Sequence, residues 1–201
     1  MVEYEDDESD AVMFAKHGDP TRLVRLVSKT LREKGLAISC AESLTGGMVA
    51  DLFVTLEGAS DVFCGGVVTY TDEVKTKVLG VDSKLLQEHT AYDPEVAVQM
   101  AVSVREMFGT DYAISTTGVA GPGSDRDVPA GKGYIAVARR DEVFVEELNC
   151  EGGRNDVRVG FAVAPFLLLH ELFNPVPGFE DCAPEIGTKW QGREAWHKMS
   201  R

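Results

Sequence analysis

An apolar run that ends at a polar, glycine-containing turn is the feature that most constrains the fold of this chain. Residues 36–40 (Leu-Ala-Ile-Ser-Cys) precede residues 41–47 (Ala-Glu-Ser-Leu-Thr-Gly-Gly), and a second apolar segment begins at Met48. This pattern predicts a buried strand that runs through a turn into a helix. The first N–H groups of such a helix lack intrahelical partners, so the turn suits a phosphate, a carboxylate or a developing oxyanion. Taken alone, Ser43 is more typical of a helix cap than of a reactive group.

The segments around this turn alternate between helix and strand patterns. A helix opened by Asp19 and Pro20 and ended by Gly35 precedes the strand, and a second strand over 62–70 follows the helix after the turn. Two strands joined through one helix normally pair in parallel. Later segments predict helices over 71–79, after Asp82, from Pro94 and over 156–173, a strand over 111–116, and a hairpin of strands 134–138 and 143–148.

The charge balance argues against nucleic acid as a general partner. The formal net charge is -13, from 33 acidic and 20 basic residues, whereas counterion release from nucleic acid needs a basic surface. The sequence has neither a run of membrane-spanning length nor a signal or transit peptide pattern, so we expect a cytoplasmic protein that is not bound to a membrane.

Cysteines and histidines do not form a metal-site pattern. The four cysteines are widely spaced without a CxxC pair, and the four histidines form neither HxH nor HExxH. We therefore expect reduced thiols, no cofactor and no tightly held metal.

Four polar, glycine-bearing segments are candidates for a single pocket. They cover residues 42–47, 58–61, 117–123 and 153–158, and two of them directly follow predicted strands. Arg154 and Arg158 are four residues apart, so they share a helix face and could bind an anion, although spacing alone is more typical of a solvated surface pair. The reactive residues in or near these segments are Ser43, Ser60, Tyr70, Lys75 and Thr117.

The motifs in these segments closely resemble one known family. In order, they are Ala41-Glu42-Ser43-x-Thr45-Gly46-Gly47, Gly58-x-Ser60, Phe63-x-Gly65-x-Val67-x-x-Tyr70-x-x-Glu73-x-Lys75, Thr117-Gly118-x-Ala120-Gly121-Pro122 and Gly153-Arg154-x-x-x-Arg158. Together they resemble the C-terminal domain of the CinA competence/damage-inducible proteins, the nicotinamide mononucleotide deamidase family, over residues 21–173. The resemblance implies a single three-layer α/β/α domain with a mixed sheet. It also implies hydrolysis of nicotinamide mononucleotide to nicotinic acid mononucleotide and ammonia, as part of NAD recycling in the pyridine nucleotide cycle.

A serine and a lysine are the natural catalytic pair, because no histidine lies in the four segments. Lys75 can act as the base if burial lowers its pKa. Both Ser60 and Ser43 are candidate nucleophiles; we favour Ser60, with Ser43 relaying a proton or holding the carbonyl and Tyr70 orienting Lys75. The residues expected to bind the mononucleotide are Glu42, Thr45, Gly46, Gly47, Thr117, Gly118, Gly121, Arg154 and Arg158.

Two segments depart from the usual family pattern. Residues 90–93 are Thr-Ala-Tyr-Asp where Gly-x-Val-Ser is frequent, and Val128 occupies a position where lysine is common. The fit of the substrate at that side of the pocket could therefore differ. The alternative functions are a nucleotide-binding or regulatory module of the same family without turnover, and an interaction protein that uses its terminal segments.

The expected organisation is an acidic tail over 1–18, an amidohydrolase domain over 19–173 and an extension over 174–201. Six acidic residues and no basic residue lie within residues 1–10, and the extension carries Trp190 and Trp196. About twenty residues precede the matched region, so we expect no N-terminal pyrophosphatase-like activity of the kind found in longer relatives. We expect a homo-oligomer.

Overall fold

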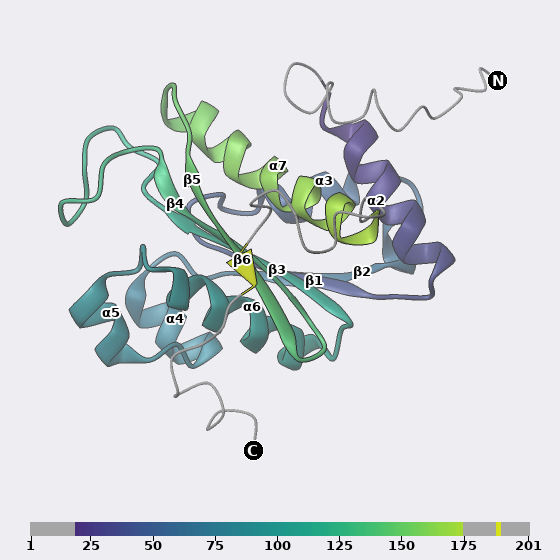
Figure 1. Ribbon diagram of the computed structural model, residues 1–201, viewed down its shortest axis with the longest axis horizontal. Coiled ribbons are helices and arrows are strands. Elements are labelled where there is room, and N and C mark those ends of the chain that lie inside the picture. The colour runs from purple at the N-terminus through teal and green to yellow at the C-terminus, as the bar shows by residue number, and fades with distance from the viewer. Residues whose placement is uncertain (1–18, 175–187, 190–201) are drawn as a thin grey trace.

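A mixed six-stranded sheet forms the middle layer of the computed structural model, which describes residues 19–174 and 188–189 (Figure 1). The strand order is β2-β1-β3-β4-β5-β6. Strand β1 lies parallel to both β2 and β3, and the remaining neighbours are antiparallel. The strands are β1 (Ile38–Glu42), β2 (Phe63–Val68), β3 (Tyr112–Gly118), β4 (Lys132–Arg139), β5 (Glu142–Asn149) and β6 (Thr188–Lys189). The parallel crossover and the hairpin predicted from the sequence are both confirmed.

Helices cover the two faces of this sheet (Figure 1). Helices α2 (Thr21–Glu33), α3 (Met48–Val54) and α7 (Arg154–Phe173) lie on one face, and α4 (Asp72–Leu79), α5 (Ser83–His89) and α6 (Pro94–Phe108) lie on the other. A short 3-10 helix, η1 (Ala59–Asp61), precedes β2. The three-layer α/β/α fold is therefore the one predicted.

The alternation of side chains along the central strands joins the layers. Ile38 and Cys40 of β1 pack into the core under α2, α3 and α7, while Ala41 packs into the core under α4, α5 and α6. All five residues of β1 are buried, as expected for a central strand covered on both faces. Strand β1 is therefore held on both faces, and the turn that begins at Ser43 starts from its buried carboxyl end.

Several helix starts follow from capping residues that are visible in the sequence. The Thr71 side chain accepts a hydrogen bond from the Val74 N–H at the start of α4, and the Asp82 side chain accepts one from Lys84 N–H at the start of α5. Pro94 is the first residue of α6. These starts confirm the helices predicted from residue 71, after Asp82 and from Pro94.

Strand β3 is longer than the sequence predicts, because it continues through Thr117 and Gly118. These two residues pair with Tyr134 and Gly133 of β4 rather than belonging to a loop. A Cβ atom on Gly133 would lie 2.4 Å from the Thr117 carbonyl oxygen, so the two strands approach closely only because this position is glycine. The glycines at 118 and 133 resemble loop residues in the sequence but serve a close strand contact.

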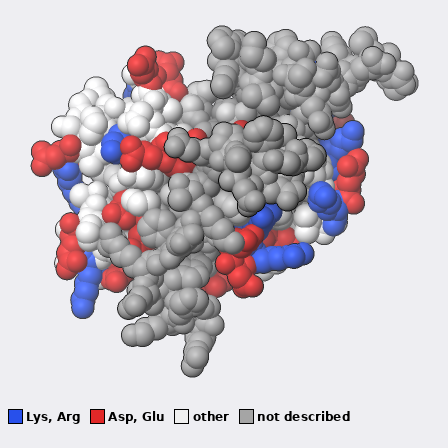
Figure 2. All heavy atoms as spheres, in the orientation of Figure 1, with Lys and Arg blue, Asp and Glu red and all other residues white. Residues whose placement is uncertain are grey.

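Parts of the predicted organisation lie outside the described residues, including the acidic segment 1–18 and the tryptophans of the extension. Within the described part, no helix has both the length and the apolar character needed to cross a membrane. Acidic and basic side chains are interspersed on the visible face of the molecule, and its described residues show no continuous basic stripe there (Figure 2).

Candidate active site

A cavity of about 500 Å³ lies beyond the carboxyl ends of the parallel strands. Its wall combines the turn after β1, the start of α4, the loop after β3 and the first turn of α7. This is the edge of an open α/β sheet at which ligands usually bind. Its lining residues include Ser43, Leu44, Tyr70, Asp72, Lys75, Tyr92, Gly118, Gly121, Asp125, Arg126 and Arg154.

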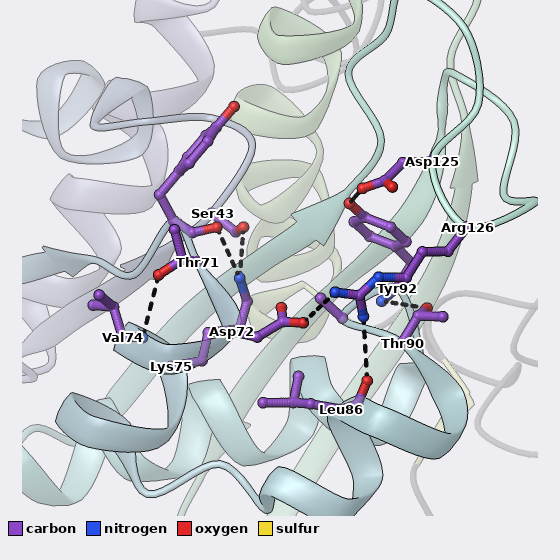
Figure 3. Close-up of polar contacts among 12 residues, drawn as sticks. Ser43, Thr71, Asp72, Val74, Lys75, Leu86, Thr90, Tyr92, Asp125 and Arg126 are labelled. Carbon is purple, nitrogen blue, oxygen red and sulfur yellow. Dashed lines mark hydrogen bonds and ion pairs between the residues drawn. The ribbon is translucent and has the colours of Figure 1, made fainter.

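Lys75 and Ser43 meet at the wall of this cavity (Figure 3). Helix α4 directs Lys75 inward, and the residue is only 1% exposed although it carries an amine. Its Nζ lies 2.9 Å from Ser43 Oγ. It donates to the backbone carbonyl oxygens of Thr69 and Tyr70, at 3.0 Å and 3.4 Å.

Burial changes the protonation of this lysine. Desolvation lowers the pKa of Lys75 to about 8, with the Asp72 carboxylate opposing the shift and the Arg126 guanidinium adding to it. About a tenth of the side chains are then neutral at pH 7. In the neutral amine, the two carbonyls can hold the remaining protons while the lone pair faces the Ser43 hydroxyl. The arrangement therefore matches an activated serine nucleophile with a lysine base.

The structure does not bring Ser60 to this cavity, contrary to the role that we favoured for it. Ser60 lies exposed in η1, before β2 begins, whereas Ser43 follows the end of β1. Because β1 and β2 run in parallel, Ser43 lies beyond the carboxyl ends of these strands and Ser60 lies before their amino ends. The length of the strands, about 20 Å, separates the two residues. Ser60 is therefore not positioned to attack a substrate bound beside Lys75.

Glu42 occupies the N-terminus of α3, where the sequence suggested an anion or oxyanion site. Its buried carboxylate accepts hydrogen bonds from the backbone N–H groups of Gly47, Val49 and Ala50, at 2.8, 3.1 and 2.9 Å. Glu42 and Gly47 are thus satisfied by each other rather than by a substrate. Within the described chain, the N–H groups of Leu44 and Thr45 have no hydrogen-bond acceptor, and Leu44 lines the cavity.

The two predicted arginines have different partners. Arg158 donates to the carbonyl oxygens of Leu44 and Thr45, at 3.2 and 3.0 Å, and so stabilises the turn that contains Ser43 without lining the cavity. Gly46 lies against this guanidinium, since a Cβ there would be 3.5 Å from Nη2. Of these two, Arg154 lines the cavity and Arg158 does not; Arg154 donates to the Gly121 carbonyl and, at 2.8 Å, to Tyr70 Oη.

Two threonines and the tyrosine also differ from their predicted roles. Thr45 and Thr117 are fully buried: the Thr45 hydroxyl lies 2.7 Å from the Thr116 hydroxyl, and Thr117 donates to the Ala91 carbonyl at 2.6 Å. Tyr70 lines the cavity, but its backbone carbonyl, rather than its ring, contacts Lys75. Gly118 and Gly121 lie in the wall, as predicted.

Sequence reasoning missed three side chains of the cavity wall, Asp72, Asp125 and Arg126, and it included Tyr92 only as part of segment 90–93 at one side of the pocket. Arg126 Nη2 lies 2.7 Å from Asp72 Oδ2, and Tyr92 Oη donates to Asp125 (Figure 3). Burial and this carboxylate contact raise the pKa of Tyr92, so its hydroxyl keeps its proton. Asp72 was interpreted only as part of a helix start. The sequence placed residues 117–123 in the candidate pocket, but nothing in it distinguished Asp125 and Arg126, which follow them.

The donor set does not resemble a metal centre in the described part of the chain. Among residues 19–174 and 188–189, no group of three or more His, Cys, Asp or Glu side chains could hold a metal ion.

Comparison with known proteins identifies the family. The model of the CinA C-terminal domain matches residues 20–173. A CinA-like protein of Geobacter sp. (strain M21) is 46% identical over 149 residues, which is 74% of this chain and 36% of the relative. A CinA-like protein of Citrifermentans bemidjiense is 45% identical over 149 residues, again 74% of this chain and 36% of the relative. The chain therefore spans little more than a third of the length of these relatives.

Solved structures with the same fold agree. A crystal structure of competence/damage inducible protein CihA from Agrobacterium tumefaciens superposes with a TM-score of 0.74 at 32% identity, covering 77% of this chain and 96% of that one. A CinA superfamily protein from Klebsiella pneumoniae gives a TM-score of 0.75 at 28% identity, covering 77% and 98%. The sequence match and the shared fold lead to the same conclusion: this chain belongs to the CinA C-terminal domain family.

Proposed function

We propose that this chain hydrolyses the carboxamide of nicotinamide mononucleotide, giving nicotinic acid mononucleotide and ammonia in the recycling of pyridine nucleotides. The observation that carries the chemistry is the 2.9 Å contact between the buried Lys75 amine and the Ser43 hydroxyl in the cavity wall. The family motifs support the choice of substrate. The cavity volume of about 500 Å³ falls within the range of small-molecule sites.

In the proposed reaction, Ser43 Oγ attacks the carboxamide carbon while its proton passes to neutral Lys75. The protonated amine then donates a proton to the departing nitrogen, so that the C–N bond breaks and ammonia leaves. A water molecule, deprotonated by Lys75, then attacks the resulting ester. The C–O bond to Ser43 Oγ breaks, the protonated lysine returns its proton to this oxygen, and the carboxylic acid leaves. One water is consumed, and the lysine returns to its neutral state.

Two further groups complete the proposed site. The Leu44 N–H follows the nucleophile in the chain and has no acceptor among the described residues, so we assign it to the tetrahedral oxyanion, which the residue after a catalytic serine binds in other hydrolases. Of the two arginines in the cavity wall, Arg126 is paired with Asp72, whereas Arg154 has no carboxylate partner among the described residues, so we assign the 5'-phosphate to the side of Arg154.

Ammonia release from nicotinamide mononucleotide by chelator-treated protein tests this function. We expect stoichiometric ammonia and nicotinic acid mononucleotide, and no need for added metal, because the reacting groups all belong to the chain. Nicotinamide riboside, which lacks the phosphate, serves as the matched substrate and should react with a lower kcat/KM. Thermal stabilisation by the mononucleotide without any product would instead support a binding or regulatory module.

A further inference from the structure

The ion pair between Arg126 and Asp72 separates the proposed active-site cavity from a neighbouring one. Both residues line the 500 Å³ cavity and a second cavity of about 650 Å³ that lies over α4 and α5. The two charged atoms are 2.7 Å apart, and the side chains are 50% and 32% exposed. The pair, which Figure 3 shows, therefore belongs to the walls of both cavities and is partly exposed to solvent.

The backbone around Arg126 is shaped to deliver this side chain. Arg126 and Asp127 have φ values of 47° and 64°, a left-handed conformation that is uncommon for residues other than glycine. The flanking Asp125 and Val128 exchange two backbone hydrogen bonds of 3.0 Å, and Tyr92 donates to the Asp125 carboxylate. Arg126 Nη1 also donates to the Leu86 carbonyl at 3.3 Å. The arginine is therefore fixed from both sides.

The position of Asp72 gives this pair an electrostatic consequence. Asp72 precedes Lys75 by three residues on α4, and residues at this spacing are neighbours on one helix face. An unneutralised carboxylate there favours the protonated amine, whereas Arg126 disfavours it. The other ionisable side chains in the cavity wall are Glu73, Tyr70, Tyr92, Asp125 and Arg154; Tyr92 holds Asp125, and Arg154 is bonded to Tyr70.

We propose that Arg126 is a positioning residue for the Ser43–Lys75 reaction: by pairing with Asp72, it prevents that carboxylate from holding Lys75 in its protonated form. The inference rests on the proposed function. It assigns to Asp72 and Arg126, which do not react themselves, the role of setting the protonation of Lys75. It also explains why a loop far from Lys75 in the sequence is tied to the start of α4.

The pH dependence of kcat/KM tests the proposal, because activity rises as Lys75 loses its proton. The parent should show a rise centred near pH 8. Arg126→Met should move the midpoint upward and Asp72→Asn should move it downward, each by roughly half a pH unit, since a partly exposed pair is screened by solvent. The double variant should return near the parent value, and Arg126→Lys should keep it. Equal midpoints in the parent and Arg126→Met, or a double variant that stays at the Arg126→Met value, would overturn the proposal.

Arg32→Met is the matched control. Arg32 also pairs with a carboxylate, Asp61, at 3.0 Å and also donates to a backbone carbonyl, but it lies in α2, away from the cavity. Its loss should leave the midpoint unchanged.

A titration that needs no turnover separates this inference from the proposed function. In ¹³C-lysine-labelled protein, NMR follows the Lys75 side chain directly, with Lys75→Met identifying its signal. If the variants shift this titration in the stated directions while no substrate reacts, the charge balance stands and the proposed function fails. If substrate reacts but the titration does not move, the inference fails and the function stands.

Discussion

Replacing Lys75 by methionine should lower kcat/KM for amide hydrolysis by about 10³-fold, the size expected when a general base is removed. Methionine has a similar length and fits a buried site, but it can neither accept the Ser43 proton nor protonate the leaving nitrogen. The folded state should persist, because burying an amine is itself unfavourable. Steady-state ammonia release gives the rate, and circular dichroism checks the fold.

Lys77→Met is the matched control for this prediction. Lys77 lies on the same helix but is exposed and does not line the active-site cavity. Its activity should stay within about twofold of the parent, as for most surface changes. A well-folded Lys75→Met variant with near-parent activity would show that another group acts as the base.

Replacing Glu42 by alanine should reduce the free energy of unfolding by about 3–5 kcal/mol, because three backbone N–H groups lose a charged acceptor inside the protein. The carboxylate is 1% exposed and makes all three contacts at 3.1 Å or less. Helix α3 has only seven residues, so it has little stability of its own to offset this loss. Urea denaturation followed by circular dichroism measures the change.

Glu57→Ala provides the comparison for Glu42→Ala. Glu57 is an exposed glutamate between α3 and η1, and its loss should change the unfolding free energy by less than about 0.5 kcal/mol. Similar stabilities for the two variants would mean that Glu42 does not hold the N-terminus of α3. A stable Glu42→Ala variant that loses substrate affinity would instead restore Glu42 to the binding role that the sequence suggested.

The layers of the fold could be predicted because they depend on local patterns. The apolar run before Ser43 and the helical periodicity after Gly47 define a strand and a helix, and one intervening helix implies parallel strands. The same topology bears on the nucleophile. When two strands are parallel, a residue that follows one of them and a residue that precedes the other lie at opposite ends of the strands. The predicted crossover therefore argues against placing Ser60, which precedes β2, beside Ser43, which follows β1.

Other features of the site depend on contacts between segments that are distant in the sequence. Arg158 reaches the carbonyl of Leu44 across 114 positions, and Arg126 reaches Asp72 across 54. No spacing rule distinguishes an arginine that binds a substrate from one that stabilises a turn, because both need the same charge on the same helix face. Such roles follow only from the geometry of the folded chain.

Ammonia release by Ser43→Ala and Ser60→Ala, measured beside the parent on nicotinamide mononucleotide, tests the central claim most directly. Ser43 Oγ lies beside the Lys75 amine, whereas Ser60 lies at the opposite ends of the strands, before β2 begins. The account predicts a loss of about 10³-fold or more for Ser43→Ala, because the nucleophile is gone, and near-parent activity for Ser60→Ala. Near-parent activity in Ser43→Ala, with the loss found in Ser60→Ala, would contradict it.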